Sequence, residues 1–489
     1  MKKIAITITI LLSCATCIAA LPDTTLAVGT ETINATNNSI ARLVGDNASN
    51  NSPALQKILD TAATRSHTTI HIPAGVYAFS GVIQMRSNVT INFAPGAKFS
   101  SRNYASFSYL SNQPGYDGGV QNVTWNNPYF DGREGTTAVS SSMLHAKNIT
   151  FNNPTWYRAQ GQGDHLIDML GSSFIMINNP QVIGTTNAYF RNPSSYYKEA
   201  FQISHATKWS YGGPALQSSA FDDLPSSNVT IKDGLFTASY DSAGNLTSYA
   251  PSPIGEHGNV ANMQISNVTF TGNSVVDPAP GSQKNWALGT IHFMATKNLT
   301  ITNNSFEYRR APTNEYVISL ESYANTANTL PTQNVIISNN TFKNVTPTKA
   351  YIYAVAAQKN GSRNTISDVA ITDNTVFLAN PAVHQPFVAR TGQQNIHNLT
   401  ERNNTFKPYP QSPTQKLKKQ KLKEKAISRP KLTELTIAKP RKLLSTRKTL
   451  QPAALVAIIV VIAIIMLIQT IIFVRHIIRQ RRRPKFQTK

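Results

Sequence analysis

NLTITNNSF, at residues 298–306, is one of several near-copies of the same asparagine-rich phrase. Similar phrases are NVTWNNPYF from Asn122, NITFNNPTW from Asn148, NVIISNNTF from Asn334 and NLTERNNTF from Asn398. Two interpretations compete. Each Asn-x-Thr could be a glycosylation acceptor, or each phrase could form the same corner of a stacked structural repeat.

The pattern inside each phrase is that of a short β-strand. In residues 298–306, Leu299, Ile301 and Phe306 alternate with polar residues, which predicts one buried face and an asparagine-rich turn at the end. The phrases are rich in Asn, Thr, Ser and Val and lack both helical periodicity and strong helix formers. They therefore predict strands rather than a helical repeat.

The spacing of the phrases indicates a solenoid. Between Asn228 and Asn398 the intervals are 34, 36, 36, 34 and 30 residues, within the range of known repeat architectures. The full set of markers is Asn88, Asn122, Asn148, Ser173, Asn228, Asn262, Asn298, Asn334, Asp368 and Asn398. Stacked copies would place equivalent strands parallel and about 4.8 Å apart, with a continuous apolar core. Asparagine tolerates the left-handed backbone needed at the corners, which favours the structural interpretation over glycosylation.

The formal charge of +22 is concentrated near the ends of the chain. Residues 416–450 contain 13 Lys and Arg against 2 acids, and residues 475–489 contain 7 Lys and Arg and no acid. With Lys2 and Lys3 also set aside, the body between them carries about +2. A nearly neutral body does not indicate nucleic-acid binding.

The two ends of the sequence predict secretion and membrane anchoring. Residues 1–27 begin with lysines, an apolar run and small residues, which predicts a signal peptide, although a lipidation signal at Cys14 is an alternative. Cys14 and Cys17 both lie inside it, so the mature chain would have no disulfide. Residues 453–474 carry no charge and predict a transmembrane helix. The basic residues 475–489 would then be a cytoplasmic tail, and 411–452 a basic stalk or disordered spacer outside the membrane.

The remaining segment, residues 42–410, is expected to form one all-β domain. It opens with NSPALQKILDTAA, in which Leu55, Ile58 and Leu59 lie at helical spacing. The segments HIPAGVYAF and NVTINFAPGAKF follow. Together these stretches resemble the opening of the pectate-lyase-like superfamily, over roughly residues 42 to 406. The resemblance implies a right-handed parallel β-helix with an N-terminal capping helix. It implies no single reaction, since the superfamily includes lyases, hydrolases, epimerases and non-catalytic adhesins.

Candidate site residues lie on the strands that precede several markers. In KEAFQISHATKW, residues 198–209, inward Phe201 and Ile203 would turn Gln202 outward, with Glu199 at the strand entrance. The long insertion that follows is rich in aromatic residues, and insertions from a solenoid commonly form its binding face. We therefore expect Lys208, Trp209 and Tyr211 to contribute to substrate binding, with packing on the solenoid flank as the alternative.

Two histidines could face the same side one coil apart. In SPIGEHGNVANMQ, inward Ile254 would turn Gly255 and His257 outward, flanked by Glu256. In GTIHFMATKN, inward Ile291 and Phe293 would turn His292 outward. The alternative for each histidine is an exposed or ladder-bonded side chain without catalytic function.

Acidic residues complete the candidate set. Asp168 lies on an earlier coil, with strand phase left open, and Asp222 and Asp223 are adjacent acids. GEHG with this upstream acidic pair is similar to the Gly-His-Gly and acidic motifs of polygalacturonases, whose Asn-Thr-Asp and Arg-Ile-Lys motifs are absent here. EAFQIS resembles a Glu-Ala-x-Gln-x-Asp segment of bacterial surface β-helix proteins, with Ser204 in place of the acid.

These residues predict chemistry on a polysaccharide. Hydrolysis needs two carboxyl groups, and elimination or epimerisation of a uronate needs a base and a cation. The expected catalytic residues are Glu199, Asp222, Asp223, His257 and His292; the expected substrate-binding residues are Gln202, Lys208, Trp209, Tyr211, Asp168 and Glu256. Ca²⁺ is a possible cofactor.

The expected function is cleavage or modification of an acidic extracellular glycan by a protein anchored in the cytoplasmic membrane of a Gram-positive bacterium. The stalk could also contact anionic wall polymers. A non-catalytic surface adhesin is the alternative.

Overall fold

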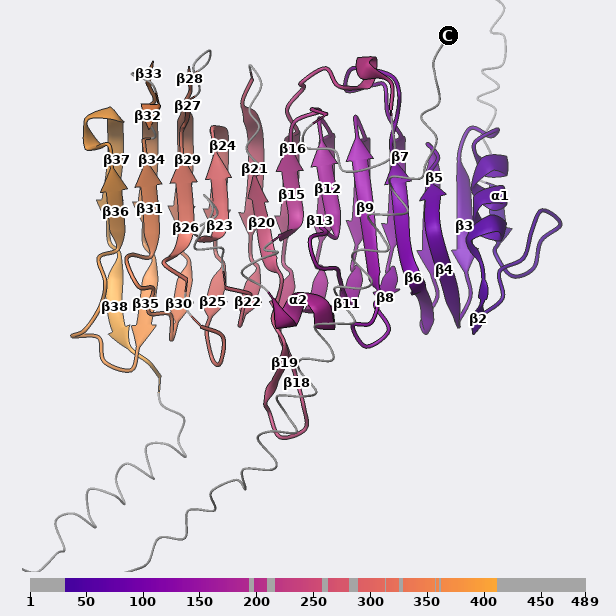
Figure 1. The fold of residues 1–489 in the computed structure, drawn as a ribbon, viewed down its shortest axis with the longest axis horizontal. Helices are drawn as coiled ribbons and strands as arrows, with labels where there is room; N and C mark the ends of the chain where they lie inside the picture. Colours follow the sequence, from indigo (N-terminus) through magenta and orange to yellow (C-terminus); the bar gives the residue numbers. More distant parts are fainter. Residues whose placement is uncertain are drawn as a thin grey trace, which may run out of the picture. The chain divides into compact units, whose positions relative to one another are not determined.

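The computed structural model describes residues 31–192, 198–208, 216–256, 263–280, 289–312, 314–324, 329–356, 358–359 and 362–410. Within these residues the chain winds into successive coils that stack along one axis (Figure 1). A typical coil contains three short strands, and each strand pairs in parallel with its equivalents in the coils before and after it. The prediction of an all-β parallel β-helix is confirmed.

One wall of the solenoid is a 12-stranded parallel sheet. Its strands, in order, are β1 (Glu31–Asn34), β3 (Thr68–Ile72), β5 (Val89–Phe93), β7 (Gln121–Asn126), β10 (Lys147–Asn152), β13 (Ser173–Asn178), β16 (Ser227–Lys232), β21 (Ile265–Thr271), β24 (Thr296–Thr302), β29 (Thr332–Ser338), β34 (Ile366–Thr372) and β37 (Ile396–Arg402). A phrase such as NLTITNNSF starts on this wall and turns the corner into the next.

The other two walls form one 20-stranded sheet, because the long strands β4 and β6 run through both. The second wall contains β2 (Asp46–Asn50), β4 (Gly75–Gln84), β6 (Ala97–Tyr109), β8 (Tyr129–Asp131), β11 (Thr155–Gln160), β14 (Gln181–Thr185), β17 (Leu235–Thr237), β22 (Ser274–Val276), β25 (Ser305–Glu307), β30 (Thr341–Lys343), β35 (Thr375–Leu378) and β38 (Thr405–Pro408). The third wall continues β4 and β6 with β9 (Ala138–Leu144), β12 (Ile167–Leu170), β15 (Glu199–Ser204), β20 (Ser252–Glu256), β23 (Gly289–Met294), β26 (Tyr316–Glu321), β31 (Ile352–Val355) and β36 (Val388–Thr391).

The repeated asparagines occupy left-handed backbone positions, as the sequence predicts. In the coil of residues 298–306, φ is 57° at Asn298 and 58° at Asn303. Asn298 also donates from Nδ2 to Asn267 Oδ1 (2.8 Å) and accepts from Asn334 Nδ2 (3.1 Å). The first asparagine of each phrase therefore links neighbouring coils on the outside of the solenoid.

The second asparagine of the NN pair forms a ladder inside the solenoid. Asn304 Oδ1 accepts from the backbone N–H of Asn273 (2.9 Å), and Asn304 Nδ2 donates to Asn340 Oδ1 (3.0 Å). Asn340 continues the ladder to Asn374, and Asn374 continues it to Asn404. Each buried side chain thus satisfies backbone groups at the corner between two walls, where the strand hydrogen bonds end.

The apolar residues of the phrases fill one continuous core. Leu299, Ile301 and Phe306 are all fully buried, as are their equivalents in most coils. Stacked aromatic rings extend through the core, for example Trp125 on Phe151 with ring centroids 6.0 Å apart. This confirms the inward phase that alternation predicts for most phrases; in the last one, exposed Glu401 takes the place of Ile301.

A helix, α1 (Ser52–Ala62), lies at the N-terminal end of the solenoid (Figure 1). Leu55, Ile58 and Leu59 on one side of it belong to the core. Gln56 donates from Nε2 to the carbonyl of Gln84 (3.1 Å) and accepts from its N–H (2.8 Å), which satisfies part of the edge of β4. That the helix covers the whole open end stays a prediction.

Shorter elements project from the coils. These are α2 (Asn187–Arg191), the 3₁₀ turns Ser218–Ala220 and Gln393–Asn395, and the antiparallel pairs β18 (Ser239–Tyr240) with β19 (Leu246–Ser248), β27 (Tyr323–Ala324) with β28 (Thr329–Leu330), and β32 (Gln358–Lys359) with β33 (Ser362–Arg363).

Two of the repeat markers were misplaced. The left-handed residue of β13 is Phe174, with φ of 55°, rather than Ser173. In β21 it is Asn267 rather than Asn262, which lies outside the described residues. Alternation alone did not reveal these positions, since the residue counts of the corners differ from coil to coil.

The predicted signal peptide 1–27, stalk 411–452, transmembrane helix 453–474 and tail 475–489 lie outside the described residues. In the part of the chain that the structure describes, no helix is long and apolar enough to cross a membrane.

Candidate functional site: buried acids and histidines on the third wall

A row of polar side chains follows the outer face of the third wall. Strand register aligns Asp168 of β12 with Gln202 of β15, Gln202 with Gly255 of β20, and Gly255 with His292 of β23. The inward neighbours Phe201, Ile203, Ile254, Ile291 and Phe293 are all buried in the core. The sequence therefore predicted correctly that Gln202, Gly255 and His292 point out of the core.

The centre of this row is a close contact between Glu199 and His292. His292 Nε2 lies 2.6 Å from Glu199 Oε1, and each side chain is only 3% exposed. The two residues belong to β15 and β23, which are separated by β20. The pair therefore reaches across an intervening coil.

Gly255 makes this reach possible. A Cβ atom on Gly255 would lie 2.5 Å from His292 Cε1 and 2.7 Å from Glu199 Cγ, closer than carbon atoms approach. Every other residue type would occupy the space in which the two side chains meet. Glycine at this register position thus leaves the space that the Glu199 and His292 side chains occupy.

Buried groups from the preceding coil fix the start of β15. His165 Nδ1 lies 2.8 Å from the carbonyl oxygen of Glu199 and 3.5 Å from its Oε2. Gln160 Nε2 donates to the carbonyls of Lys198 (3.1 Å) and Glu199 (3.0 Å). Because Ala200 and Phe201 both face the core, the alternation shifts at this point and Glu199 turns outward.

Asp168 forms the next part of the row. Gln202 Nε2 donates to Asp168 Oδ1 (2.8 Å). Burial raises the pKa of Asp168 to about 7, although the charge of Lys198 acts in the opposite direction and the charge of Glu199 adds to the rise. Asp168 therefore exchanges a proton near neutral pH.

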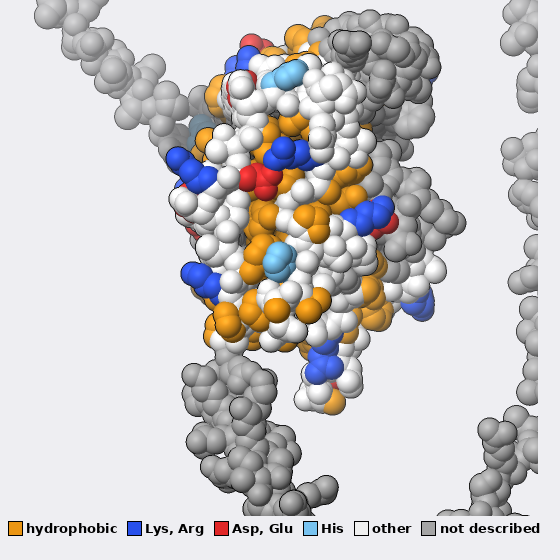
Figure 2. Space-filling model, turned by 90° about the vertical axis from the view of Figure 1, so that its left-hand side faces the viewer, with side chains coloured by type: hydrophobic (Ala, Val, Ile, Leu, Met, Phe, Trp, Pro, Cys, Tyr) orange, Lys and Arg blue, Asp and Glu red, His pale blue; other side chains and the backbone are white. Residues whose placement is uncertain are grey.

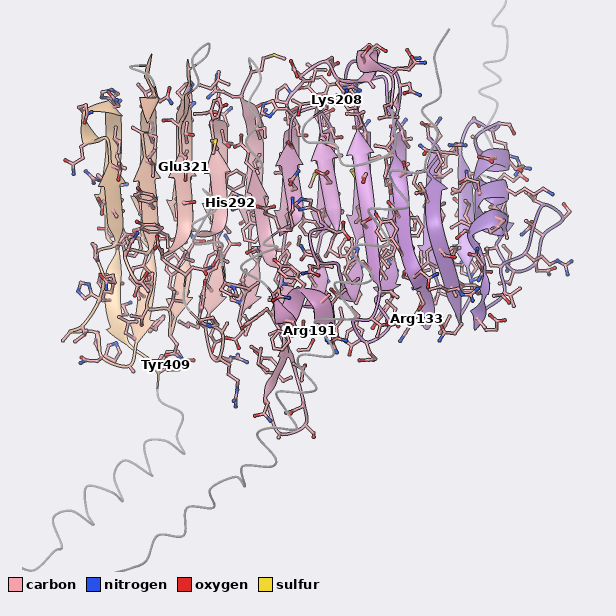
Figure 3. The ribbon with its side chains drawn as sticks, in the orientation of Figure 1. Arg133, Arg191, Lys208, His292, Glu321 and Tyr409 are labelled. Carbon is pink, nitrogen blue, oxygen red and sulfur yellow. The ribbon has the colours of Figure 1, made fainter. Side chains whose placement is uncertain are left out.

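Two more carboxyl groups with raised pKa are the last residues of β20 and β26, the strands on either side of β23. Burial raises the pKa of Glu321 in β26 to about 7, against the attraction of His292. Burial raises the pKa of Glu256 to about 8, while hydrogen bonds to its Oε2 from Thr296 Oγ1 (2.5 Å) and the Met294 N–H (2.7 Å) act against the rise. Figure 3 shows His292 and Glu321 on neighbouring strands. From strand geometry their Cα atoms are about 8 Å apart.

This arrangement is suited to acid–base chemistry. A carboxyl group that keeps its proton near neutral pH can act as a general acid, and an imidazole supported by a carboxylate can act as a base. Glu321 and the Glu199–His292 pair, on adjacent coils, have the chemistry that these two roles require. Among the described residues, no group of three or more acids and histidines has the geometry of a metal site, and the possible Ca²⁺ site stays a prediction.

Asp222 and Asp223 lie away from this cluster. Asp222 Oδ1 is 2.9 Å from Nε2 of His145, which follows the C-terminal end of β9, and Oδ2 accepts from the Gly115 N–H (2.7 Å). Burial opposes ionisation of Asp222, but the hydrogen bonds from Gly115 and His145 outweigh it and lower its pKa. Asp223 is exposed and has a left-handed φ of 61°.

The expected convergence of these two acids with Glu199 is therefore not observed. The Asp222–His145 contact joins two loops at the strand ends, whereas Glu199 starts its strand, roughly 17 Å away along β15.

The remaining predicted residues divide into two groups. Lys208 is exposed and lies in a turn beyond the C-terminal end of β15, apart from His292 (Figure 3). His257, Trp209 and Tyr211 lie outside the described residues. Of the predicted residues, the structure thus gathers Glu199, His292, Gln202 and Asp168. Glu256 is in register with the inward Ile203 and instead accepts hydrogen bonds from Met294 and Thr296.

Sequence reasoning missed Glu321 and the supporting Gln160. Glu321 could have been found by aligning YVISLE with GTIHFM, since inward Ile318 and Leu320 turn Ser319 and Glu321 outward one coil beyond His292. Gln160 gave no such signal, because its contacts are with the backbone 38 and 39 residues away.

Comparison with known proteins agrees with this architecture. Residues 41–118 match the family described as rhamnogalacturonase A/epimerase, pectate lyase-like. No curated protein matches the sequence. The fold is similar to PfbA, a surface adhesin of Streptococcus pneumoniae, at 18% identity and a TM-score of 0.51, covering 75% of this chain and 90% of that one. It is also similar to a tailspike protein of the E. coli bacteriophage HK620, at 12% identity and a TM-score of 0.50, covering 77% of this chain and 67% of that one. The chain therefore has the parallel β-helix fold of the pectate-lyase-like superfamily.

Proposed function

We propose that this protein acts on an extracellular polysaccharide by acid–base catalysis on the third wall of its β-helix. The observation that carries the proposal is the Glu199–His292 pair, 2.6 Å apart, next to a carboxyl group with a pKa of about 7 at Glu321. Shifted carboxyl groups that converge with a histidine are more common at functional sites than elsewhere in a protein.

In this proposal the imidazole of His292 takes a proton, and Glu199 stabilises the imidazolium that forms. Glu321 is protonated below about pH 7 and donates a proton to the leaving glycosidic oxygen in a hydrolase or lyase. In an epimerase no glycosidic bond breaks, and Glu321 instead gives its proton to the carbon next to the uronate carboxylate, on the face opposite to the one from which the first proton was taken. The proton that His292 takes comes from water in a hydrolase, or from the carbon next to a uronate carboxylate in a lyase or epimerase. Lys198, whose charge partly offsets the rise in the pKa of Asp168, is the cation that would favour an acidic glycan.

The proposal also includes attachment to the cell surface. The segment 453–474 would anchor the chain in the membrane, and the basic segment 411–452 would hold the β-helix away from it. These two roles rest on sequence alone.

The test is to incubate the full chain with acidic and neutral polysaccharides, with and without Ca²⁺. New reducing ends would indicate hydrolysis, and ultraviolet absorbance of an unsaturated product would indicate elimination. We expect His292→Gln and Glu199→Gln to lower the rate by about 10²-fold or more, while His397→Gln on the 12-stranded wall leaves it unchanged. No turnover of any glycan by a folded protein would exclude the enzyme.

Burial favours a second candidate, a non-catalytic glycan-binding adhesin. Both members of the Glu199–His292 pair are 3% exposed, as expected of a buried polar contact that only joins coils. An adhesin would bind glycans without turnover, and binding would survive simultaneous alanine replacement of Glu199, Asp223, His257 and His292.

A further inference from the structure

The outer face of the 12-stranded sheet carries a groove that the proposed catalysis does not use. Its volume is about 650 Å³, and it extends across β10, β13, β16, β21 and β24. It is lined by Asn148, Thr150, Phe174, Ile175, Met176, Asn228, Thr230, Asn267, Thr269, Asn298 and Thr300. The four strand spacings between β10 and β24 make the groove about 19 Å long.

Most of this surface consists of two regular rows. Asn148, Asn228, Asn267 and Asn298 form one row, and Thr150, Thr230, Thr269 and Thr300 form the other, with equivalent residues in register from coil to coil. Their amides and hydroxyls are repeated at the strand spacing. These groups can donate and accept hydrogen bonds but carry no charge.

Phe174 and Met176 of β13 interrupt both rows. Phe174 is 52% exposed and Met176 is 41% exposed, whereas large apolar side chains normally pack into the interior. Phe174 also has a φ of 55°, a conformation that asparagine tolerates at most equivalent corners but that is strained for a bulky aromatic residue. An exposed, strained aromatic side chain in a polar row suggests a role in binding.

The interruption also alters the asparagine ladder beside Phe174. Asn148 Nδ2 donates to Asn122 Oδ1 (3.1 Å), and Asn267 Nδ2 donates to Asn228 Oδ1 (3.0 Å). Phe174 has no amide to join these two segments. Among the described residues, no amide donates to Asn148 Oδ1, and Asn228 Nδ2 turns to Ser227 Oγ (3.3 Å). An acceptor and a donor thus flank the ring, about 10 Å apart across the coil of β13.

We infer that this groove binds an uncharged oligosaccharide, with one sugar ring stacked on Phe174. The C–H groups of a sugar ring carry partial positive charge and match the negative face of an aromatic ring. Asn148 Oδ1 and Asn228 Nδ2 bond the hydroxyls of that sugar, and Thr230, Thr269 and Thr300 bond the next ones. The lining contains no ionisable side chain, so neither a uronate nor a cationic sugar finds a counter-charge there. Lys232 of β16 is charged, but it lies two positions beyond Thr230, in the row beside the groove, and is not part of the lining.

The test measures binding of soluble neutral glucans, mannans and galactans to the full-length protein by calorimetry, with polygalacturonate for comparison. We expect Phe174→Ala and Phe174→Asn each to weaken neutral-glycan binding by about tenfold or more. Ile336→Ala is the matched control, because Ile336 is 46% exposed in the same row as Thr300 but outside the groove. It should alter affinity by less than about twofold.

Stability separates a binding role from a structural one. Phe174→Asn restores the residue type found at the equivalent corners, so we expect the melting temperature to rise while binding falls. Unchanged glycan binding by Phe174→Ala, or no binding by any neutral glycan, would overturn the inference. Self-association that depends on Phe174 would instead assign this face to a second copy of the chain. His292→Gln, which tests the proposed catalysis, should leave binding in this groove intact, so the two proposals fail separately.

Discussion

At the scale of single residues, Gly255 controls whether Glu199 and His292 can meet. Its backbone is not in the left-handed region, so alanine is compatible with the chain conformation and the effect of Gly255→Ala is steric. We expect this substitution to separate the pair, to lower turnover of the identified glycan by at least about tenfold, and to lower the free energy of unfolding by about 1–3 kcal/mol. Initial rates and urea unfolding measure the two effects.

Ser142→Ala is the matched control, since Ser142 lies in the same outer row, paired with Asp168. It should change neither measurement. If Gly255→Ala retained full activity, the contact between Glu199 and His292 would have no part in the reaction.

Glu256 should make stability fall as the pH rises. Its pKa is about 8 in the folded protein against an ordinary value of 4.5, so the folded state binds the proton more tightly than the unfolded chain. The stabilising effect of that proton is complete below about pH 4.5 and is lost between there and about pH 8, at up to about 1.4 kcal/mol per pH unit. Asp168 and Glu321 act in the same direction.

We therefore expect Glu256→Gln to lose less stability than the parent between about pH 5 and about pH 8, measured by urea unfolding at both values. Gln keeps an oxygen acceptor for Met294 and Thr296. Glu307→Gln is a suitable contrast, because a hydrogen bond from Arg309 lowers the pKa of Glu307. A parental pH slope in Glu256→Gln would show that Glu256 ionises normally.

At the scale of the structural elements, the internal asparagine ladder holds the corners of successive coils together. Asn340 Oδ1 accepts from the Asn304 N–H (3.0 Å), and Asn340 Nδ2 donates to the Ile301 carbonyl (2.8 Å). Asn340→Ala would leave both buried backbone groups without partners. We expect it to lower the free energy of unfolding by roughly 2–4 kcal/mol, measured by denaturant titration.

The matched control for this ladder is Asn334→Gly on the outside of the solenoid. Asn334 has a φ of 56° and bonds Asn298 in an exposed ladder, and glycine keeps the left-handed conformation. We expect a change below about 0.5 kcal/mol. Equal losses from the two substitutions would mean that burial of the ladder is unimportant.

Most of what could be predicted from the sequence came from the alternation of apolar and polar residues along the strands. It identified the inward faces of β15, β20 and β23, and with them the outward Gln202 and His292. It failed where the alternation shifts: Leu166 and Ile167 are both core residues at the start of β12, which left the phase of Asp168 open.

Contacts made by loops were beyond prediction from local patterns. Asp222 pairs with His145, 77 residues earlier, and nothing in either segment encodes that distance. The prediction that Asp222 and Asp223 lie beside Glu199 was therefore wrong. Glu199 and His292 could be placed on the same wall because both belong to regular strands in register.

At the scale of the whole molecule, the β-helix that the structure describes ends with the coil that contains β36, β37 and β38. β38 pairs with β35, the Tyr409 N–H donates to the Leu378 carbonyl (2.7 Å), and Tyr409 Oη donates to Glu307 Oε1 (3.1 Å). Figure 2 looks onto this end and shows hydrophobic side chains exposed across it. The partly buried residues that pack against the core in this last coil are Val388, Ile396, Leu399 and Phe406.

Two truncations should therefore behave differently. A chain that stops after Gln411, where the first compact unit ends, keeps every strand that the structure describes, and we expect its melting temperature to equal that of the full chain. A chain that stops after Asn380 loses β36, β37 and β38 and uncovers Val369, Ile371 and Val376, which are now buried. We expect the second chain to melt at a lower temperature and to bind a hydrophobic dye, because the newly exposed apolar area is not replaced by other contacts. A lower melting temperature for the chain ending at Gln411 would contradict this expectation and would mean that later residues stabilise the apolar end seen in Figure 2.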